Sequence, residues 1–223
     1  MRNIIGRPAA TILMVPLVAL FSCKKLPETS FTFSPTENPE AGEYIQFENT
    51  TPEASSYNWD FGDGNSSDQE NPKHLFLQAG SFEVKLTATN DAGDQSKSET
   101  IIINDPTVLA FLILDSTGTI PMKGAEVWLY DNQSDWDNFE EPMILRTTGN
   151  TGEVQFDNME AIIYYIWAFK DEAEGFWASG GYTPALVQND INAFTVPCFW
   201  VPFETEKASR QFPKPLQLNQ RIH

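Results

Sequence analysis

Apolar and polar residues alternate with a period of two along much of the chain. In residues 81–89, SFEVKLTAT, the apolar side chains occupy every second position and polar side chains lie between them. This alternation predicts a half-buried β-strand, because successive side chains of a strand point to opposite faces. Residues 44–49, 57–61 and 98–103 behave similarly, and turn residues separate them. Short strands divided in this way are typical of a β-sandwich.

A second set of apolar segments follows a break at residues 104–106, Asn-Asp-Pro. Asn and Asp favour turns, and a proline restricts the residue before it, so the break predicts a short linker between two modules. The pair Gly180–Gly181 is interpreted as a turn. The expected fold class is therefore all-β, with two tandem β-sandwiches. The strands expected in the second module are residues 107–114, 125–131, 143–148, 152–156, 162–170 and 192–201.

The N-terminal segment predicts export. Arg2 and Arg7 supply positive charge before residues 8–21, and this segment is apolar apart from one threonine. A helix of that length spans roughly 21 Å, at about 1.5 Å per residue, and a bilayer core is about 30 Å thick. The segment is therefore interpreted as the core of a signal peptide at residues 1–22, not as a membrane span.

The residues that follow, LFSC, end at Cys23 and resemble the lipobox of bacterial lipoproteins. That resemblance implies a lipid on Cys23 and cleavage just before it. Lys24 follows the cysteine with no Asp retention signal, so by resemblance the outer membrane is favoured over the inner. Two or three acyl chains would anchor the protein stably, since each buried methylene contributes roughly 0.8 kcal/mol. The alternative is an ordinary secreted protein with a chance cysteine.

The expected domain organisation follows from these features. A tether at residues 23–29 leads to the first sandwich, residues 30–104, and a second sandwich covers residues 107–203. Residues 204–223 lack an apolar period and are expected to be a loose C-terminal tail. With Cys23 acylated, only Cys198 remains, so an internal disulfide is excluded and packed cores must supply the stability.

The chain is strongly acidic, with 31 Asp and Glu against 14 Lys and Arg, a net charge of −17. Such a surface repels nucleic acid and anionic lipid headgroups, so a nucleic-acid partner is not expected. The membrane is expected to be contacted through the lipid on Cys23.

Acids, glycines and one histidine gather in residues 58–76. Calcium could be held by Asp60, Asp63 and Asp68, but the spacing of an EF-hand loop is absent. The simpler interpretation is that the carboxylates accept backbone N–H bonds in a tight turn. The chain has two histidines, of which only His74 lies within this motif, so a catalytic relay or histidine-rich zinc site is disfavoured. No enzyme activity, cofactor or metal is predicted.

The same motif carries a family resemblance. The run YNWDFGDG, followed by NPKHLFLQAGSFEVKLTATNDAG, resembles a PKD domain over roughly residues 28–104. Phe76 and Phe82 stand where that family usually carries tyrosines. The resemblance implies a seven-stranded immunoglobulin-like sandwich, with Trp59 as its core tryptophan and His74 as a structural neighbour of the turn. It also implies a spacer, binding or adhesion role outside the cell.

The second module, over about residues 107–200, resembles transthyretin-like sandwiches, which include carboxypeptidase regulatory-like and Cna B-type domains. Pro-x-x-Gly-Ala-x-Val, Thr-Thr-x-x-x-Gly and Tyr-x-Ile-x-Ala patterns carry this resemblance. The residues that fill them include Pro121, Gly124, Ala125, Val127, Thr147, Thr148, Gly152, Val154, Phe156, Tyr164, Ile166 and Ala168.

Aromatic residues of the second module form a candidate binding surface. If Tyr164, Ile166 and Ala168 face the core, the alternation leaves Trp167 and Phe169 on the other face. Flat rings suit stacking on sugars or docking a partner, and exposed apolar patches mark binding surfaces. The alternative is that loops or the tail cover these rings. The candidate residues are Trp136, Phe139, Trp167, Phe169, Trp177 and Tyr182.

The sequence therefore favours a non-catalytic, lipid-anchored cell-envelope protein whose sandwich modules bind a protein or polysaccharide at the surface. The alternative is a structural spacer or accessory subunit of a larger envelope assembly, with no ligand of its own. A hydrolase of unrecognised type is the weakest hypothesis.

Overall fold

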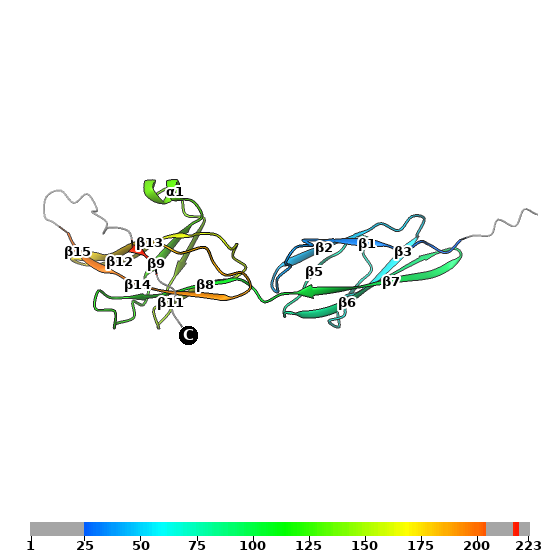
Figure 1. Ribbon diagram of the computed structural model, residues 1–223, viewed down its shortest axis with the longest axis horizontal. Coiled ribbons are helices and arrows are strands. Elements are labelled where there is room, and N and C mark those ends of the chain that lie inside the picture. The colour runs from blue at the N-terminus through cyan, green and yellow to red at the C-terminus, as the bar shows by residue number, and fades with distance from the viewer. Residues whose placement is uncertain (1–24, 204–215, 219–223) are drawn as a thin grey trace, which may run out of the picture.

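The structure is a computed structural model, and it describes residues 25–203 and 216–218. These residues form two β-sandwiches that lie end to end along the long axis of the molecule (Figure 1). The expected all-β class and the tandem sandwiches are confirmed. The signal peptide predicted at residues 1–22 and the lipid predicted on Cys23 lie outside the described residues.

Seven strands build the first domain as two antiparallel sheets. One sheet has the order β1-β2-β5 and the other has the order β4-β3-β6-β7. Strands β2, β3, β6 and β7 overlap the four segments that the period-two pattern predicted, and β7 begins earlier than predicted, at Gly93. The bounds are β1 (Phe31–Ser34), β2 (Tyr44–Asn49), β3 (Ser56–Asp60), β4 (Ser66–Ser67), β5 (Lys73–Leu75), β6 (Gly80–Asn90) and β7 (Gly93–Ile103).

An aromatic core lies between the two sheets of the first domain. Trp59 is fully buried there, and the ring centroids of Phe31 and Phe47 lie 5.1 and 5.4 Å from its own. Trp59 Nε1 donates a hydrogen bond to the carbonyl of Gln69 at 2.9 Å, so its buried polar atom is satisfied. The expected role of Trp59 as the core tryptophan is confirmed.

Among the described residues, nine strands and one short helix build the second domain. Its larger sheet has the order β10-β9-β12-β13-β15, with β16 also beside β13, and its smaller sheet has the order β11-β8-β14. Strand β14 runs parallel to β8, and the segment predicted at residues 192–201 is split into β14 and β15 at Cys198. The bounds are β8 (Val108–Leu114), β9 (Glu126–Tyr130), α1 (Gln133–Asn138), β10 (Ile144–Thr147), β11 (Glu153–Phe156), β12 (Tyr165–Glu172), β13 (Gly175–Tyr182), β14 (Ile191–Pro197), β15 (Phe199–Pro202) and β16 (Leu216–Gln217).

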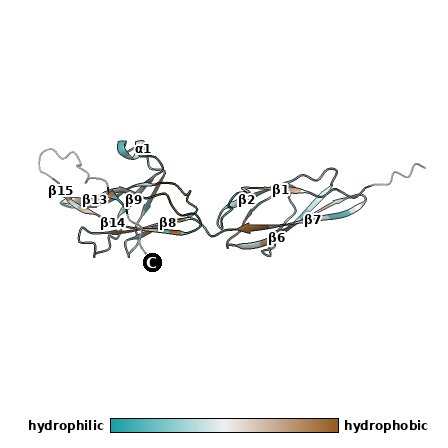
Figure 2. Cartoon of the chain, viewed as in Figure 1, coloured by the Kyte–Doolittle hydropathy of each residue, from teal (hydrophilic) through white to brown (hydrophobic). Residues whose placement is uncertain are grey.

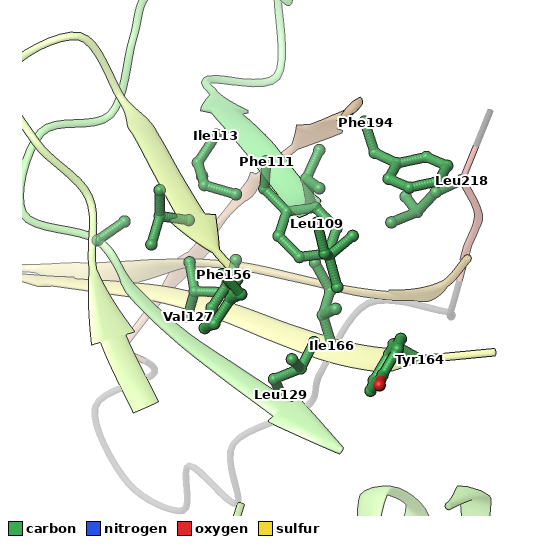
Figure 3. Close-up of a cluster of buried hydrophobic side chains, with 14 of the residues drawn as sticks. Leu109, Phe111, Ile113, Val127, Leu129, Phe156, Tyr164, Ile166, Phe194 and Leu218 are labelled. Carbon is green, nitrogen blue, oxygen red and sulfur yellow. The ribbon is translucent and has the colours of Figure 1, made fainter. Parts of the chain in front are cut away.

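The larger sheet of the second domain is apolar on both faces. Tyr164, Ile166 and Ala168 join the core between the two sheets, as the alternation predicted. Figure 3 shows Tyr164 and Ile166 in this core together with side chains of β8. Trp167 and Phe169 lie in a separate cluster, and because they alternate with the core residues they occupy the outer face. We call this cluster the outer aromatic cluster; it contains Tyr130, Trp136, Trp167, Phe169, Phe176 and Ala178.

The prediction of a turn at Gly180–Gly181 is wrong. Both glycines lie inside β13, paired with Trp167 and Ile166 of β12. A Cβ on Gly180 would lie 2.3 Å from Trp167 Cζ3, and a Cβ on Gly181 would lie 2.5 Å from the carbonyl oxygen of Leu216. The glycines therefore mark a close approach of a ring and a neighbouring backbone within a strand.

Part of the expected C-terminal tail belongs to the second domain. Leu216–Gln217 form β16, which runs parallel to β13, and Leu218 is 4% exposed within the core (Figure 3). A strand of two residues is too short to produce a periodic pattern, so the sequence did not indicate it. Residues 204–215 and 219–223 lie outside the described residues.

The short helix α1 follows from its capping residues. The side chain of Asn132 accepts a hydrogen bond from the Asp135 amide at 2.9 Å, and Phe139 ends the helix in the left-handed conformation. Figure 2 shows α1 as largely hydrophilic, but its Trp136 is buried against the sheet. Across residues 25–203 and 216–218, no helix has both the length and the apolar character needed to span a membrane.

Candidate functional sites

Carboxylates and a glycine shape the tight turn that follows β3. Asp60 Oδ1 accepts a hydrogen bond from the Gly62 amide at 3.0 Å, and Asp63 Oδ1 accepts one from the Asn65 amide at 3.0 Å. Gly62 has a φ of +76°, and a Cβ on it would lie 2.7 Å from the carbonyl oxygen of Glu83. The interpretation of the motif as a hydrogen-bonded turn is confirmed.

His74 holds this turn from the other sheet. Its Nε2 lies 2.7 Å from Asp63 Oδ2, and its ring stacks on Phe61 with centroids 3.9 Å apart. Burial would raise the pKa of Asp63, but hydrogen bonds from His74 and Asn65 outweigh burial and lower this pKa. His74 is therefore the structural neighbour of the turn that the resemblance implied.

The motif shows no arrangement for binding a metal. Within the part of the chain that the structure describes, no group of three or more His, Cys, Asp or Glu side chains is placed to hold an ion. Asp60 and Asp63 are engaged with backbone amides, while Asp68 is exposed.

Replacing Asp63 with Asn should lower the free energy of unfolding of the first domain by about 1–2 kcal/mol near pH 7. The folded-state pKa of Asp63 lies below its unfolded value of about 3.9, so the ionised carboxylate stabilises the fold above that pH. This contribution is lost as the pH falls through the folded-state pKa, so the difference between the proteins should narrow from pH 4 to pH 2. Urea unfolding across this range measures it. Asp68→Asn is the matched control, and an Asp63→Asn deficit that stays constant with pH would contradict the prediction.

The first domain matches a known family. The family model described as PKD domain covers residues 27–104. These residues form a PKD domain. In it, Phe76 and Phe82 fill the two usual tyrosine positions, and their ring centroids lie 4.6 Å apart. Phenylalanine at both positions is therefore accommodated by a direct ring contact.

The PKD domain also appears in relatives that are much longer. Collagenase ColQ1 of Bacillus cereus (strain Q1) is 49% identical over 47 residues, which cover 21% of this chain and 5% of the collagenase. Pre-pro-metalloprotease PrtV of Vibrio cholerae serotype O1 (strain M66-2) is 42% identical over 55 residues, or 24% of this chain and 6% of PrtV. The crystal structure of the PrtV PKD1 domain is 30% identical, covers 35% of this chain and 98% of that chain, and has a TM-score of 0.31. The matched part thus spans only about a twentieth of these two curated relatives.

Three of the six candidate binding residues are buried in the outer aromatic cluster. Trp136, Trp167 and Phe169 are 2%, 4% and 9% exposed. Trp136 stacks on Trp167 at 5.2 Å and donates its Nε1–H to the carbonyl of Ile166 at 2.9 Å. Trp167 in turn donates its Nε1–H to the carbonyl of Trp136 at 3.2 Å. These contacts hold α1 on the sheet, so the burial of these rings contributes to stability.

The other three candidates are more accessible but do not form one surface. Phe139 is 38% exposed and stacks on Trp167 with centroids 4.9 Å apart. Trp177 packs against the core side of the larger sheet and meets the edge of Trp200 at 5.4 Å. Tyr182 lies on the outer face, 6.1 Å from Tyr165. Ligand binding by the six residues stays a prediction.

A groove on the larger sheet contains an aromatic residue that the sequence reasoning passed over. Trp128 on β9 is half-buried, and the ring of Phe169 meets it at 5.1 Å and 70°. Trp128 Nε1 donates to Glu126 Oε2 at 3.1 Å. The groove has a volume of about 450 Å³, and its other lining residues are Lys123, Gly124, Lys170 and Asp171. The alternation of residues 125–131 places Trp128 on the face opposite to the core, and this periodicity could have identified it as a candidate binding residue.

A buried carboxylate connects the two domains. Glu40, in the loop before β2, is 7% exposed. Thr107 of the second domain donates its amide to Oε2 at 2.9 Å and its hydroxyl to Oε1 at 2.7 Å. Asn189 Nδ2 donates to Oε1 at 3.0 Å, and Asn158 Nδ2 donates to the carbonyl of Ala41 at 2.9 Å. We call this set of contacts the Glu40 joint.

Three asparagines around the joint share an unusual backbone conformation. Asn38, Asn158 and Asn189 have φ values of 48°, 54° and 58°. Asparagine tolerates this left-handed region better than most residues with a Cβ. Their side-chain amides lie 3.2, 3.5 and 3.0 Å from Glu40 carboxylate oxygens, the second contact being weak at that length. Loops of both domains are therefore shaped around one carboxylate.

Proposed function

We propose that this protein is a non-catalytic, lipid-anchored protein of the cell envelope that presents a binding domain for a protein or glycan. The anchor in this proposal is a lipid on Cys23, inserted in the outer membrane after removal of residues 1–22. The PKD domain serves as a spacer, and a transthyretin-like second domain carries the binding surface.

The position at which the chain enters the PKD domain carries this proposal. The carbonyl of Lys25 accepts a hydrogen bond from Asn90 Nδ2 at 2.9 Å, next to the turn between β6 and β7. Strand β7 ends at the opposite end of the domain, where the chain passes into β8 of the second domain (Figure 1). A lipid on Cys23 would therefore hold the PKD domain near the membrane and the second domain away from it.

Two further features support this arrangement. The Glu40 joint links the domains by direct hydrogen bonds and so favours a fixed extension. The net charge of −17 disfavours contact between the body of the protein and anionic headgroups, so attraction to the membrane has to come from the lipid.

A structural spacer or accessory subunit with no ligand of its own is the second candidate. The Glu40 joint supports this candidate as well, because a spacer needs only a fixed geometry between its two ends. Affinity capture with the tagged, lipidated protein from an envelope extract separates the two candidates. Recovery of a glycan or of a single specific protein favours the binding role, whereas recovery of a multi-protein envelope assembly or of nothing favours the spacer or accessory subunit.

Replacing Cys23 with Ser should release the protein from the membrane fraction. Without the thiol no acyl chain can be attached, and two or three chains are what anchor such a protein stably. Fractionation of cells, together with incorporation of a palmitate analogue, measures the effect. Cys198→Ser is the matched control, because Cys198 is buried in the second domain and should leave both readouts unchanged. Equal sedimentation of the Cys23→Ser and wild-type proteins would rule out the lipid anchor.

A further inference from the structure

We infer that the groove beside Trp128 binds an uncharged saccharide. This inference rests on the proposed binding function, and it names the site and the class of ligand. The groove of about 450 Å³ falls within the range of about 300–1,000 Å³ that is usual for small-molecule sites. The groove lies at the end of the paired region of β9 and β12, next to the pair of Glu126 and Phe169. The two hydrogen-bonded strands give it a rigid base.

Trp128 provides a fixed aromatic platform in this groove. It pairs with Trp167 on β12, and Phe169 supports it edge-on at 5.1 Å. The hydrogen bond from its Nε1 to Glu126 at 3.1 Å fixes the rotation of the indole. A ring held in this way loses little conformational freedom when a ligand stacks on it. The apolar C–H face of a pyranose is suited to such a platform.

Charged residues of both signs line the groove, and Lys170 is also ion-paired with Glu172 at 2.9 Å. Lys123 and Lys170 carry two positive charges, and Glu126 and Asp171 carry two negative charges. Sugar hydroxyl groups both donate and accept hydrogen bonds, so they can pair with both kinds of group. A carboxylate accepts about four hydrogen bonds, so Glu126 can accept one from a hydroxyl while it holds Trp128.

The same residues disfavour other classes of ligand. An acyl chain would remove the charged lining side chains from water without offering any hydrogen bond in return, which is unfavourable. An anionic ligand would approach a chain of net charge −17, and that field opposes its association. An uncharged, hydroxyl-rich ligand avoids both costs, so the geometry points to a neutral glycan.

Titration with four neutral oligosaccharides tests the inference: cellohexaose, maltohexaose, xylohexaose and hexa-N-acetylchitohexaose, followed by calorimetry and saturation-transfer NMR. We expect at least one to bind, and Trp128→Ala to weaken it about tenfold or more. Trp128→Phe keeps an aromatic ring and protects the fold, and it should weaken binding by only about threefold. The affinity should change less than about twofold between 50 and 500 mM NaCl, because the ligand carries no charge.

Trp200→Ala is the matched control, since Trp200 is also partly exposed on the larger sheet but does not line the groove. It should leave the affinity unchanged. Absence of binding by all four sugars, or equal affinities for the wild-type and Trp128→Ala proteins, would overturn the inference. Binding of hexalysine or polygalacturonate that depends on Trp128 would overturn it too, by assigning a charged ligand. None of these outcomes alters the membrane release expected for Cys23→Ser, so failure of this inference is distinguishable from failure of the anchored role.

Discussion

Replacing Trp59 with alanine should destabilise the PKD domain by about 3–5 kcal/mol. The side chain is fully buried, and the rings of Phe31, Phe47 and Phe61 lie around it with centroids within 6.5 Å. Its loss leaves a cavity and also leaves the carbonyl of Gln69 without the indole N–H. Because a typical domain is stable by about 5–15 kcal/mol, this one change should remove a large part of the total.

Urea unfolding followed by two-dimensional NMR measures this effect for each domain separately. The PKD resonances should be lost at a lower urea concentration, whereas the second domain keeps its own core and should unfold later. Trp200→Ala removes the same side chain from the partly exposed strand β15 and should cost less than about 1 kcal/mol. Unfolding of the PKD domain at the wild-type urea concentration would show that Trp59 does not anchor its core.

Replacing Glu40 with alanine should free the two domains to move relative to each other. The change removes the acceptor for the amide and hydroxyl of Thr107 and for the side-chain amide of Asn189. A buried donor left without a partner costs about 1–3 kcal/mol, so the closed joint should open and admit water. Glu40→Gln should rescue only in part, because donors face both carboxylate oxygens and glutamine has one acceptor oxygen.

Pulsed electron paramagnetic resonance between one spin label in each domain reports this freedom. Exposed Glu48 and Glu153, replaced by cysteine, are suitable label positions in a Cys23→Ser background. Cys198 should remain unlabelled, because it is buried and burial raises its pKa to about 12. The distance distribution should be narrow in the parent protein and broad in Glu40→Ala. Glu83→Ala removes an exposed acid from the same domain as a control, and equal widths in all variants would refute a fixed joint.

Features that depend on neighbouring residues could be predicted from the sequence. The faces of residues 164–170 follow from strict alternation, and the structure places Ile166 in the core and Trp167 outside it. The turn after β3 was predictable because Asp60 and Asp63 bond to amides only two residues away. In each case the cause lies within a few residues of the effect.

Features that depend on distant partners could not be predicted in the same way. The Glu40 joint pairs residues 67 and 149 positions apart, and in the sequence Glu40 sits in an ordinary turn-rich segment. Trp136 lies in a polar insert, and its burial follows from α1 folding back onto β12. Trp128 had the right periodicity, but a groove arises only when two strands come together.

The fit of Trp167 over Gly180 ties the evolution of these two positions together. The indole occupies the space that any side chain at position 180 would need. Substitution of Gly180 is therefore tolerable only in a lineage in which Trp167 has already been replaced by a smaller residue. In descendants of this sequence the two sites should change as a pair, and the order of the two changes should be the same in each branch.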